Sequence, residues 1–468
     1  MALAHVSLWL FLLFLPWAPT LFSPWGGHDA SRLAQVLVTV VCASVLAVRT
    51  WRGQLYWPAF GTLTGRVLLS LLGALAACSV ANAPSTTQAL LELALFVSMV
   101  VVALTVAQTA LSERWLHAYA AVIVSSMVLY GVLEIMICVA GLLSGSAPRE
   151  GLVGLGYDNY RLLNHVQTAA IPLAALAAIR PDGTRLLRAG ARVALATWFA
   201  LLIFSGGRGT ELGLAIGLGA AAWVSGRHIL PGLRQLLFGA ASGVLLYLAV
   251  YRGLPWLFGL PDPQSLLDRV RDGNSVFARL VLWKWAGGAI LEAPWVGIGP
   301  MHLAQRWNDD AAHPHNVYLQ VAAEWGLAML VVCLALIGRG LLRMVEAVRR
   351  STVEDSRKAE GAMLLVAGSA VLMDGGVSGN FVMPMAQMWI ALVAGLGLAW
   401  LGRGAADRLV VTGRVFGSSC FALCALLSCW VLVDQKVEIS DMSAHLKQVN
   451  TQFPSPRSNP RFWSHGWF

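Results

Sequence analysis

Long apolar runs recur along almost the whole chain and are separated by short polar loops. Many of these runs approach about 20 residues, the length that a helix needs to cross a bilayer. Spanning helices are predicted at 3–22, 33–49, 60–80, 88–111, 116–143, 163–179, 193–205, 210–225, 235–251, 317–338, 361–383, 386–401 and 415–433. The pattern therefore predicts an all-α polytopic membrane protein with about 12–13 transmembrane helices.

The composition agrees with a protein that is solvated by lipid. Only 12% of the residues are charged and 57% are hydrophobic, whereas soluble domains carry about 25% charged residues. The net charge of +9 would suit nucleic acid, but the arginines cluster in short loops between the apolar runs. These loops all fall on one side if every span is kept, as expected for the cytoplasmic side. The basic residues thus indicate topology rather than a nucleic acid partner.

The predicted spans divide the chain into four regions. Residues 1–251 form an N-terminal transmembrane bundle, 252–316 a large segment on the periplasmic face, 317–433 the C-terminal transmembrane helices, and 434–468 a tail predicted on the periplasmic face. The large segment contains an amphipathic stretch, "SVFARLVLWKWAGGAIL", which predicts a short helix lying at the interface. It is too short for a separate catalytic domain, so chemistry is expected at the membrane surface.

Three arginines on the periplasmic side have no topological reason to be there. Arg208 lies between glycines that let a backbone approach a ligand closely, and it opens a helix whose N-terminal amides suit an anion. Arg161 opens another span, and Arg279 lies on the amphipathic stretch, five residues before Lys284. Guanidinium groups that converge here would bind a pyrophosphate bidentately. Snorkelling at a helix end or contact with lipid headgroups is the alternative interpretation.

The stretch "AHPHNVYLQVAAEWG" places His315 where the large segment returns to the membrane. A histidine with a pKa of about 6.5 can be neutral at working pH and can remove a proton from a hydroxyl; a helix-capping or interface histidine is the alternative.

One cluster resembles a metal site and consists of Asp309, Asp310, His313 and His315. Their spacing in a proline-broken loop is poor for metal binding, so no metal ligand is predicted. Walker and Rossmann glycine motifs are absent from the sequence.

A family resemblance rests on this stretch. His315-Asn316, followed by nine residues and Gly326, resembles the signature of the O-antigen ligase and polymerase superfamily. Met329 departs from the small or Val/Thr residue usual three positions after the glycine, which bears on helix packing rather than chemistry. The stretches "SGGRG", "RLVLWKWAGGAILEAPWVGIGP", "NYRLLNHVQT" and "NFVMPMAQMW" are also similar to segments of the family. The resemblance covers roughly residues 150–400.

The resemblance implies an enzyme of the bacterial inner membrane that uses no metal, nucleotide or other cofactor. Such an enzyme moves a glycan from undecaprenyl pyrophosphate to an acceptor hydroxyl at the periplasmic face. On this basis His315 is the expected base, and the expected pyrophosphate ligands are Arg208, Arg161 and Arg279. The expected supporting residues are His313, Asn316, Tyr318 and Lys284.

Several functions fit the sequence. Within the family, the favoured acceptor is lipid A–core, ahead of a pilin-like protein and of a second lipid-linked glycan. A lipid or polysaccharide transporter is the non-enzymatic alternative, because buried polar residues mark transport paths; Glu92, Glu134, Asp374 and Asn380 are its few candidates. A metal-dependent glycosyltransferase that uses Asp29 is the remaining enzymatic alternative.

Overall fold

The computed structural model describes residues 1–17, 27–55, 62–146, 154–260, 274–308, 310–350, 353–403, 414–436, 439, 461–464 and 466–468. Within these ranges the chain forms helices joined by turns and loops, with no strand. Asp309, considered above as a metal ligand, lies outside the described residues, as does most of the predicted tail.

The long helices are α3 (Gly27–Trp51), α4 (Leu63–Ala81), α5 (Thr86–Thr109), α6 (Glu113–Leu143), α7 (Tyr160–Ile179), α8 (Arg185–Ser205), α9 (Arg208–Ser225), α10 (Leu230–Tyr247), α13 (Asn274–Glu292), α15 (Leu327–Arg349), α16 (Asp355–Gly375), α17 (Pro384–Gly402) and α18 (Arg414–Asp434). The shorter ones are α1 (Ala2–Phe14), α11 (Leu254–Leu257) and α14 (Val317–Trp325). Ten helical stretches among the described residues are long and apolar enough to cross a membrane. The predicted all-α polytopic membrane fold is confirmed.

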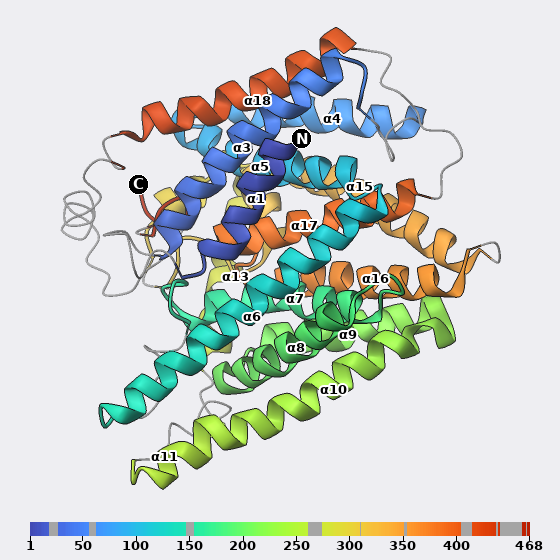
Figure 1. The fold of residues 1–468 in the computed structure, drawn as a ribbon. Helices are drawn as coiled ribbons and strands as arrows, with labels where there is room; N and C mark the ends of the chain where they lie inside the picture. Colours follow the sequence, from blue (N-terminus) through green and yellow to red (C-terminus); the bar gives the residue numbers. More distant parts are fainter. Residues whose placement is uncertain are drawn as a thin grey trace.

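The helices pack side by side and run at a slant across Figure 1, with α18 and α3 along one edge and α10 along the other. At the centre, α16 packs against α9 and α7, and α17 packs against α5. Helices α7 and α17 are the most enclosed of the candidate spans. Both helices therefore pack against other helices over most of their surface.

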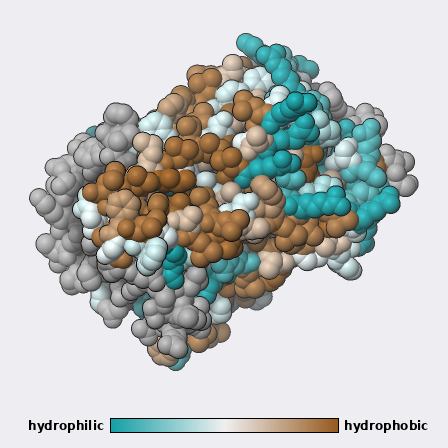
Figure 2. All heavy atoms as spheres, turned by 60° about the horizontal axis from the view of Figure 1, so that its bottom comes forward, coloured by the Kyte–Doolittle hydropathy of each residue, from teal (hydrophilic) through white to brown (hydrophobic). Residues whose placement is uncertain are grey.

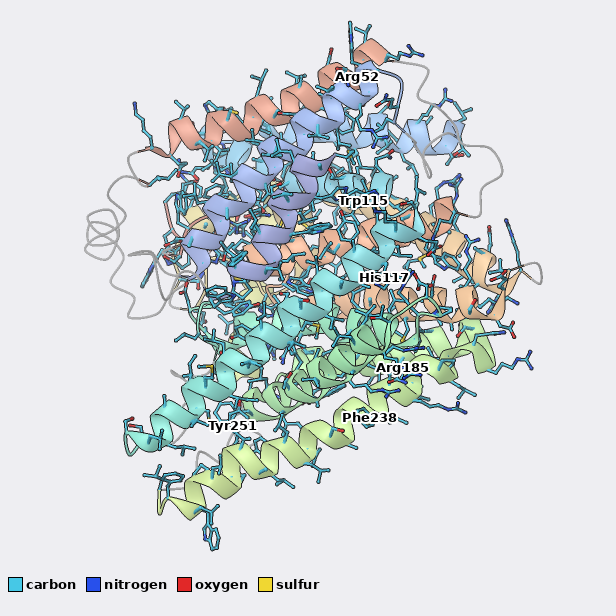
Figure 3. The ribbon with its side chains drawn as sticks, in the orientation of Figure 1. Arg52, Trp115, His117, Arg185, Phe238 and Tyr251 are labelled. Atoms are coloured by element: carbon cyan, nitrogen blue, oxygen red, sulfur yellow. The ribbon has the colours of Figure 1, made fainter. Side chains whose placement is uncertain are left out.

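The bundle has two chemically different ends. Arg52 and Arg185 lie toward one end and Tyr251 toward the other (Figure 3). In the space-filling view, apolar side chains cover a broad band of the visible face, and hydrophilic side chains gather at the end that carries the arginine-rich loops (Figure 2). We call this the arginine-loop end, and we call the end at which His315 lies the histidine end.

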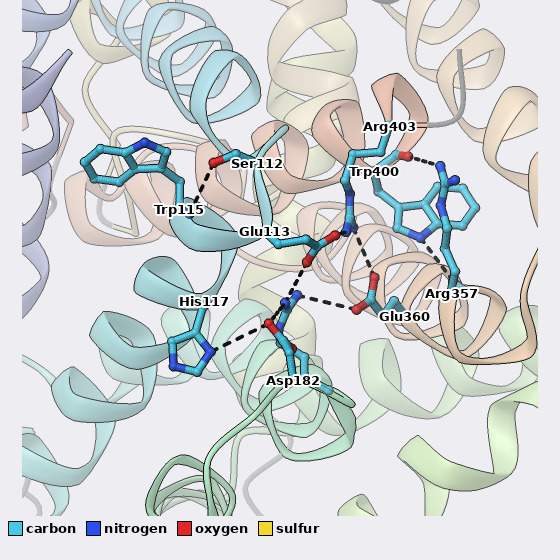
Figure 4. A network of polar contacts seen from close by, with 10 residues as sticks. Ser112, Glu113, Trp115, His117, Asp182, Arg357, Glu360, Trp400 and Arg403 are labelled. Carbon is cyan, nitrogen blue, oxygen red and sulfur yellow. Dashed lines mark hydrogen bonds and ion pairs between the residues drawn. The ribbon is translucent and has the colours of Figure 1, made fainter. Parts of the chain in front are cut away.

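A network of ion pairs ties four helices together at the arginine-loop end (Figure 4). The buried Arg180 guanidinium lies 3.0 Å from Glu113, 2.6 Å from Asp182 and 3.4 Å from Glu360. Arg403 bridges the same two glutamates, at 2.7 Å from Glu113 and 3.0 Å from Glu360. The network therefore joins the end of α7 to the starts of α6 and α16 and to the end of α17.

Arg180→Ala is expected to lower the free energy of unfolding by roughly 3 kcal/mol, because it leaves the buried Glu360 carboxylate short of a counter-ion. Arg227→Ala is the matched control, since Arg227 forms a 3.7 Å pair with Asp355 in which both side chains are exposed. That pair should contribute at most about 1 kcal/mol. Melting temperatures of the purified proteins in detergent check this, and equal shifts for the two variants would contradict it.

One predicted span is wrong. The apolar run at 317–338 was expected to form a single helix, but Gly326 divides it into α14 and α15. Gly326 has φ +89°, and a Cβ there would lie 2.1 Å from the carbonyl oxygen of Trp295. The preceding chain thus packs directly against the backbone at this glycine. Helix α14 belongs to the histidine end, and the membrane-crossing helix begins at Leu327.

Gly326→Ala is expected to destabilise the protein by more than about 1–3 kcal/mol, the usual cost of a strained backbone conformation, because the new methyl group also overlaps Trp295. Gly340→Ala on α15 provides the control, since a Cβ at Gly340 meets no atom within 4 Å. That change should be neutral or stabilise the helix by about 0.5–1 kcal/mol. Thermal unfolding in detergent distinguishes the two, and an unaffected Gly326→Ala protein would refute the assignment.

Other predicted boundaries also move. The span predicted at 361–383 is α16, which starts at Asp355 and ends at Gly375, so the next residues form a turn before α17. The span predicted at 235–251 continues from α10 through a π-helical turn, Leu248–Gly253, into α11. The first predicted span, 3–22, overlaps the helix Ala2–Phe14, and residues 18–26 lie outside the described residues.

Candidate functional site

The chain between α13 and α14 is tied to α14 by its backbone. The N–H of Ile298 donates to the carbonyl oxygen of Ala323 at 2.9 Å, and the N–H of Gly299 donates to that of Glu324 at 3.2 Å. A short 3₁₀ helix, His302–Gln305, follows. We call residues 299–316 the histidine loop, because it contains His313-Pro314-His315 just before the Asn316 cap of α14.

The two histidines of the loop contact each other. Their ring centroids are 4.2 Å apart at an interplanar angle of 62°, and the backbone N–H of His315 donates to Nδ1 of His313 at 3.2 Å. An acceptor Nδ1 means that the neutral His313 ring carries its proton on Nε2. His315 has φ +50°, a left-handed conformation that is uncommon outside glycine and is often found at functional sites.

His313 is completely enclosed, whereas the side chain of His315 is only partly covered. A Cβ at Gly379 would lie 2.6 Å from Cε1 of His313, so the glycine gives this ring its space. The indole N–H of Trp283, on α13, donates to the carbonyl oxygen of Pro314 at 3.1 Å. The loop is thus held between α13 and the turn after α16.

Two predicted supporting residues serve local structure. The side-chain oxygen of Asn316 accepts from the N–H groups of Tyr318 and Leu319, both at 3.0 Å, and so caps α14. The Tyr318 hydroxyl donates to the carbonyl oxygen of Leu372 on α16 at 2.7 Å. Capping, considered above as an alternative for the histidine, is therefore done by Asn316. Both residues orient the helix that follows His315.

The three predicted arginines come from three helices at the histidine end. Arg161 is in the first turn of α7 and Arg208 begins α9, and both are exposed. Arg279 is half-buried on α13, four residues from Trp283 and thus on the same face of that helix. Burial, followed by the charges of Arg161 and Arg208, lowers the pKa of Arg279. Arg279 therefore lies close enough to Arg161 and Arg208 for both of their charges to act on it.

The turn between α8 and α9 positions Arg208. Gly206 ends α8 with φ +62°, and a Cβ at Gly207 would lie 2.8 Å from the amide of Asn164 on α7. The hydroxyl of Thr210 donates to the carbonyl oxygen of Asn164 at 2.7 Å. These glycines, predicted to admit a ligand, allow α9 to start directly against the first turns of α7.

A buried carboxylate lies beneath the arginines. Asp374, at the end of α16, is 1% exposed; its Oδ2 is 3.8 Å from Nδ1 of His165 and accepts from the Thr168 hydroxyl at 3.1 Å. A Cβ at Gly209 would lie 2.6 Å from Oδ1, so this oxygen faces the start of α9. The negative charge of Asp374 raises the pKa of Arg279 and so partly opposes the lowering by Arg161 and Arg208. The sequence had suggested Asp374 only as part of a transport path.

Burial and nearby positive charges keep the His315 ring neutral. Burial, followed by the positive charges of Arg279 and Arg161, lowers the pKa of His315 to about 4. Burial, followed by the charge of His315, also holds the pKa of His313 well below its usual range. At pH 7 both rings are therefore uncharged, and His315 can accept a proton.

Lys284 is separate from this group. It is exposed on α13, and five residues of helix turn it about 140° from Arg279. Among the described residues, no three histidine, cysteine or acidic side chains are grouped so that they could hold a metal ion. The cationic side chains of the site are the three arginines, which suit phosphate oxygens.

The arrangement defines a class: a many-spanning helical membrane protein with guanidinium groups and a neutral imidazole gathered at one end of its bundle. Residues 193–334 match the model of a family described as O-Antigen ligase. The chain is also 28% identical over 140 residues to a "Putative polysaccharide ligase" of Rickettsia bellii (strain RML369-C). That similarity covers 26% of this chain and 33% of the relative. The predicted resemblance to the O-antigen ligase superfamily is confirmed by these matches.

The matched range includes much of the site. It runs from α8 into the start of α15 and contains Arg208, Arg279 and His315, while Arg161 precedes it. Over this part of the chain the protein is therefore similar to O-antigen ligases.

Proposed function

We propose that this protein transfers a glycan from undecaprenyl pyrophosphate to an acceptor hydroxyl at the histidine end of the bundle. The proposal is supported by the position of Arg161, Arg208 and Arg279 at the end of the bundle at which His315 lies, where the charges of Arg279 and Arg161 act on His315 and those of Arg161 and Arg208 act on Arg279. Guanidinium groups match the planar pairs of oxygens on a pyrophosphate. An uncharged imidazole beside them supplies a base for the acceptor.

The reaction is a single displacement at the anomeric carbon of the donor sugar. The acceptor oxygen forms the new bond to that carbon, and its proton passes to the unprotonated nitrogen of His315. The bond between the anomeric carbon and the pyrophosphate oxygen breaks, and its electron pair leaves with undecaprenyl pyrophosphate. The arginines stabilise the negative charge that develops there. The anomeric configuration is inverted.

The donor is already activated, so the proposed reaction needs neither a nucleotide nor a metal. The phosphate charge that a divalent cation would neutralise is neutralised here by guanidinium groups. A chelator is therefore expected to leave the transfer rate unchanged.

The favoured acceptor is lipid A–core, with the protein in the bacterial inner membrane and the histidine end facing the periplasm. The orientation is supported by the arginine-rich loops at the other end, which mark the cytoplasmic side. The acceptor is supported by the relative's name, a polysaccharide ligase.

The buried polar residues that suggested a transporter have local partners. Glu134 accepts from the Tyr130 hydroxyl at 2.6 Å, and the Asn380 amide donates to the carbonyl oxygen of Val371 at 3.0 Å. Glu92 accepts from Gln320 at 3.0 Å. Side chains engaged in this way favour a structural role over a polar path through the bundle.

The test is a lipopolysaccharide gel of a gene-deletion strain that carries wild-type protein, His315→Ala or His117→Ala. His117 is the control because it lies at the arginine-loop end, 3.7 Å from Asp182. The long-chain ladder should return with wild type and His117→Ala but not with His315→Ala, while undecaprenyl-linked glycan persists in all strains. A ladder that never depends on the gene would overturn lipid A–core as the acceptor, and glycosylation of a pilin-like protein would be assayed next.

A further inference from the structure

A buried arginine from the far end of the sequence reaches the histidine loop. Arg461 is 1% exposed, and its Nη2 contacts carboxylate oxygens of Glu324 on α14 and, at 3.1 Å, of Glu92 on α5. Its Nη1 donates to the carbonyl oxygen of Ala312 at 3.4 Å. Ala312 directly precedes His313, so this guanidinium touches the backbone of the loop.

The same carboxylate also holds the beginning of the loop. Oε1 of Glu324 accepts from the backbone N–H of Leu303 at 3.0 Å. Gln320, one turn earlier on α14, donates to Glu92 at 3.0 Å. Arg461 and Glu324 thus connect the 3₁₀ helix at one end of the histidine loop with Ala312 near the other.

The segment that carries Arg461 is fastened to two other helices. The Arg32 guanidinium on α3 donates to the carbonyl oxygens of Phe462 and Arg461, both at 3.1 Å. Asp29, also on α3, accepts from the N–H and the hydroxyl of Ser464, both at 2.7 Å. Phe462 lies in a buried hydrophobic cluster that also contains Val36 of α3 and Val431 of α18. These contacts fix the position of the segment from which the Arg461 side chain reaches the histidine loop.

We propose that Arg461 is a positioning residue that keeps the histidine loop, and with it His315, in place against the three arginines of the site. The inference rests on the proposed function, because its consequence is a lower rate of transfer. Arg461 lies beneath the loop and contacts the Ala312 backbone, so it acts through the loop.

Position 461 requires the planar, forked arrangement of N–H donors that a guanidinium group provides. Three acceptors from three segments surround it, and the planar group with its several N–H donors can bond to all of them. A lysine ammonium keeps the charge that Glu92 and Glu324 need, but it is a point charge that lacks the fixed fork. Arg461→Lys therefore keeps the positive charge beside the two buried carboxylates but removes the set of hydrogen bonds that holds the loop.

The experiment compares wild type, Arg461→Lys and a control, Arg306→Ala, with the full chain in lipid nanodiscs. Arg306 belongs to the same loop, but its pair with Glu292, at 2.7 Å, is exposed. Two quantities are measured: amide hydrogen exchange at residues 311–316, and kcat and KM for the undecaprenyl-linked donor. Arg461→Lys should accelerate exchange on the order of tenfold and lower kcat up to about 100-fold, as expected for small misplacements of reacting groups, with KM unchanged. Arg306→Ala should change neither quantity.

A second variant guards against failure to fold. Arg461→Met combined with Glu92→Gln and Glu324→Gln removes all three buried charges, so its folding needs no counter-ion. It should fold, exchange faster at 311–316 and transfer slowly. Unchanged exchange in both variants overturns the proposal, as does faster exchange with an undiminished kcat. A third outcome separates the two proposals. If the variants exchange faster but the wild type itself transfers no glycan, Arg461 does hold the loop and the proposed function is overturned instead.

Discussion

Replacement of His315 by alanine is expected to lower kcat for glycan transfer by about 10²–10⁴-fold, the usual contribution of a general base. The imidazole is the only proton acceptor in the proposed reaction, while donor binding depends on the arginines. KM for the donor should therefore change little. A transfer assay with purified protein and undecaprenyl-linked donor measures both constants, with His117→Ala as the control at the other end of the bundle.

The pH dependence of the wild type provides an independent check. Because the pKa of His315 is lowered to about 4, the base stays unprotonated above about pH 5, and kcat/KM should be flat from there to neutrality. The rate should fall as the pH drops through that pKa. A bound pyrophosphate adds negative charge beside His315, which opposes the effect of the arginines and raises the pKa in the complex. The acid limb of kcat should therefore lie at higher pH than that of kcat/KM.

Two results would contradict this role. One is His315→Ala protein that retains full kcat; the other is an acid limb that persists unchanged in this variant, which would show that another group is titrating.

Replacement of Arg279 by alanine is expected to reduce kcat by about 10²–10³-fold, or roughly 2.7–4 kcal/mol, as for loss of one donor to a developing oxyanion. Arg279 is the half-buried member of the three arginines, and the charges of both Arg161 and Arg208 lower its pKa. Arg279→Lys should recover part of the loss, because it restores the charge without the planar fork. Steady-state kinetics of the two variants provide the measurement.

Arg185→Ala serves as the control for Arg279→Ala, since Arg185 is exposed at the arginine-loop end (Figure 3). It should leave kcat and KM unchanged. An equal loss in both variants would indicate a general effect of removing positive charge, and an Arg279→Ala enzyme of normal kcat would exclude Arg279 from the leaving-group site.

The fold was predictable because lipid imposes a simple rule: long apolar runs become helices. The boundary at Gly326 was not, because the break depends on the approach of Trp295, which sequence periodicity does not report. The early end of α16 was missed for a similar reason. The stretch "GGVSGN", residues 375–380, carries turn signals that overall hydropathy does not register, and it forms the turn between α16 and α17.

The arginines and His315 could be selected from the sequence because topology gave them no other purpose. Glu324 and Arg461 were missed, since each has its partner far along the chain, 137 residues away, and Asp374 was considered only as part of a transport path. A signal was present, however. An ionisable side chain within an apolar run is costly and needs a partner, and Glu324 interrupts such a run without a nearby basic residue.

The ion pair between Glu92 and Arg461 has a consequence for how the protein is made. The two residues are 369 positions apart, and a ribosome that adds about 5–20 residues per second needs roughly 20–70 s to cover that distance. During this time α5 is already synthesised, but its carboxylate has no guanidinium beside it. Nascent chains should therefore lack the ion pair between Glu92 and Arg461 until Arg461 is synthesised. The segment around Arg461 can therefore bind beneath the histidine loop only after α5 and that loop have been synthesised.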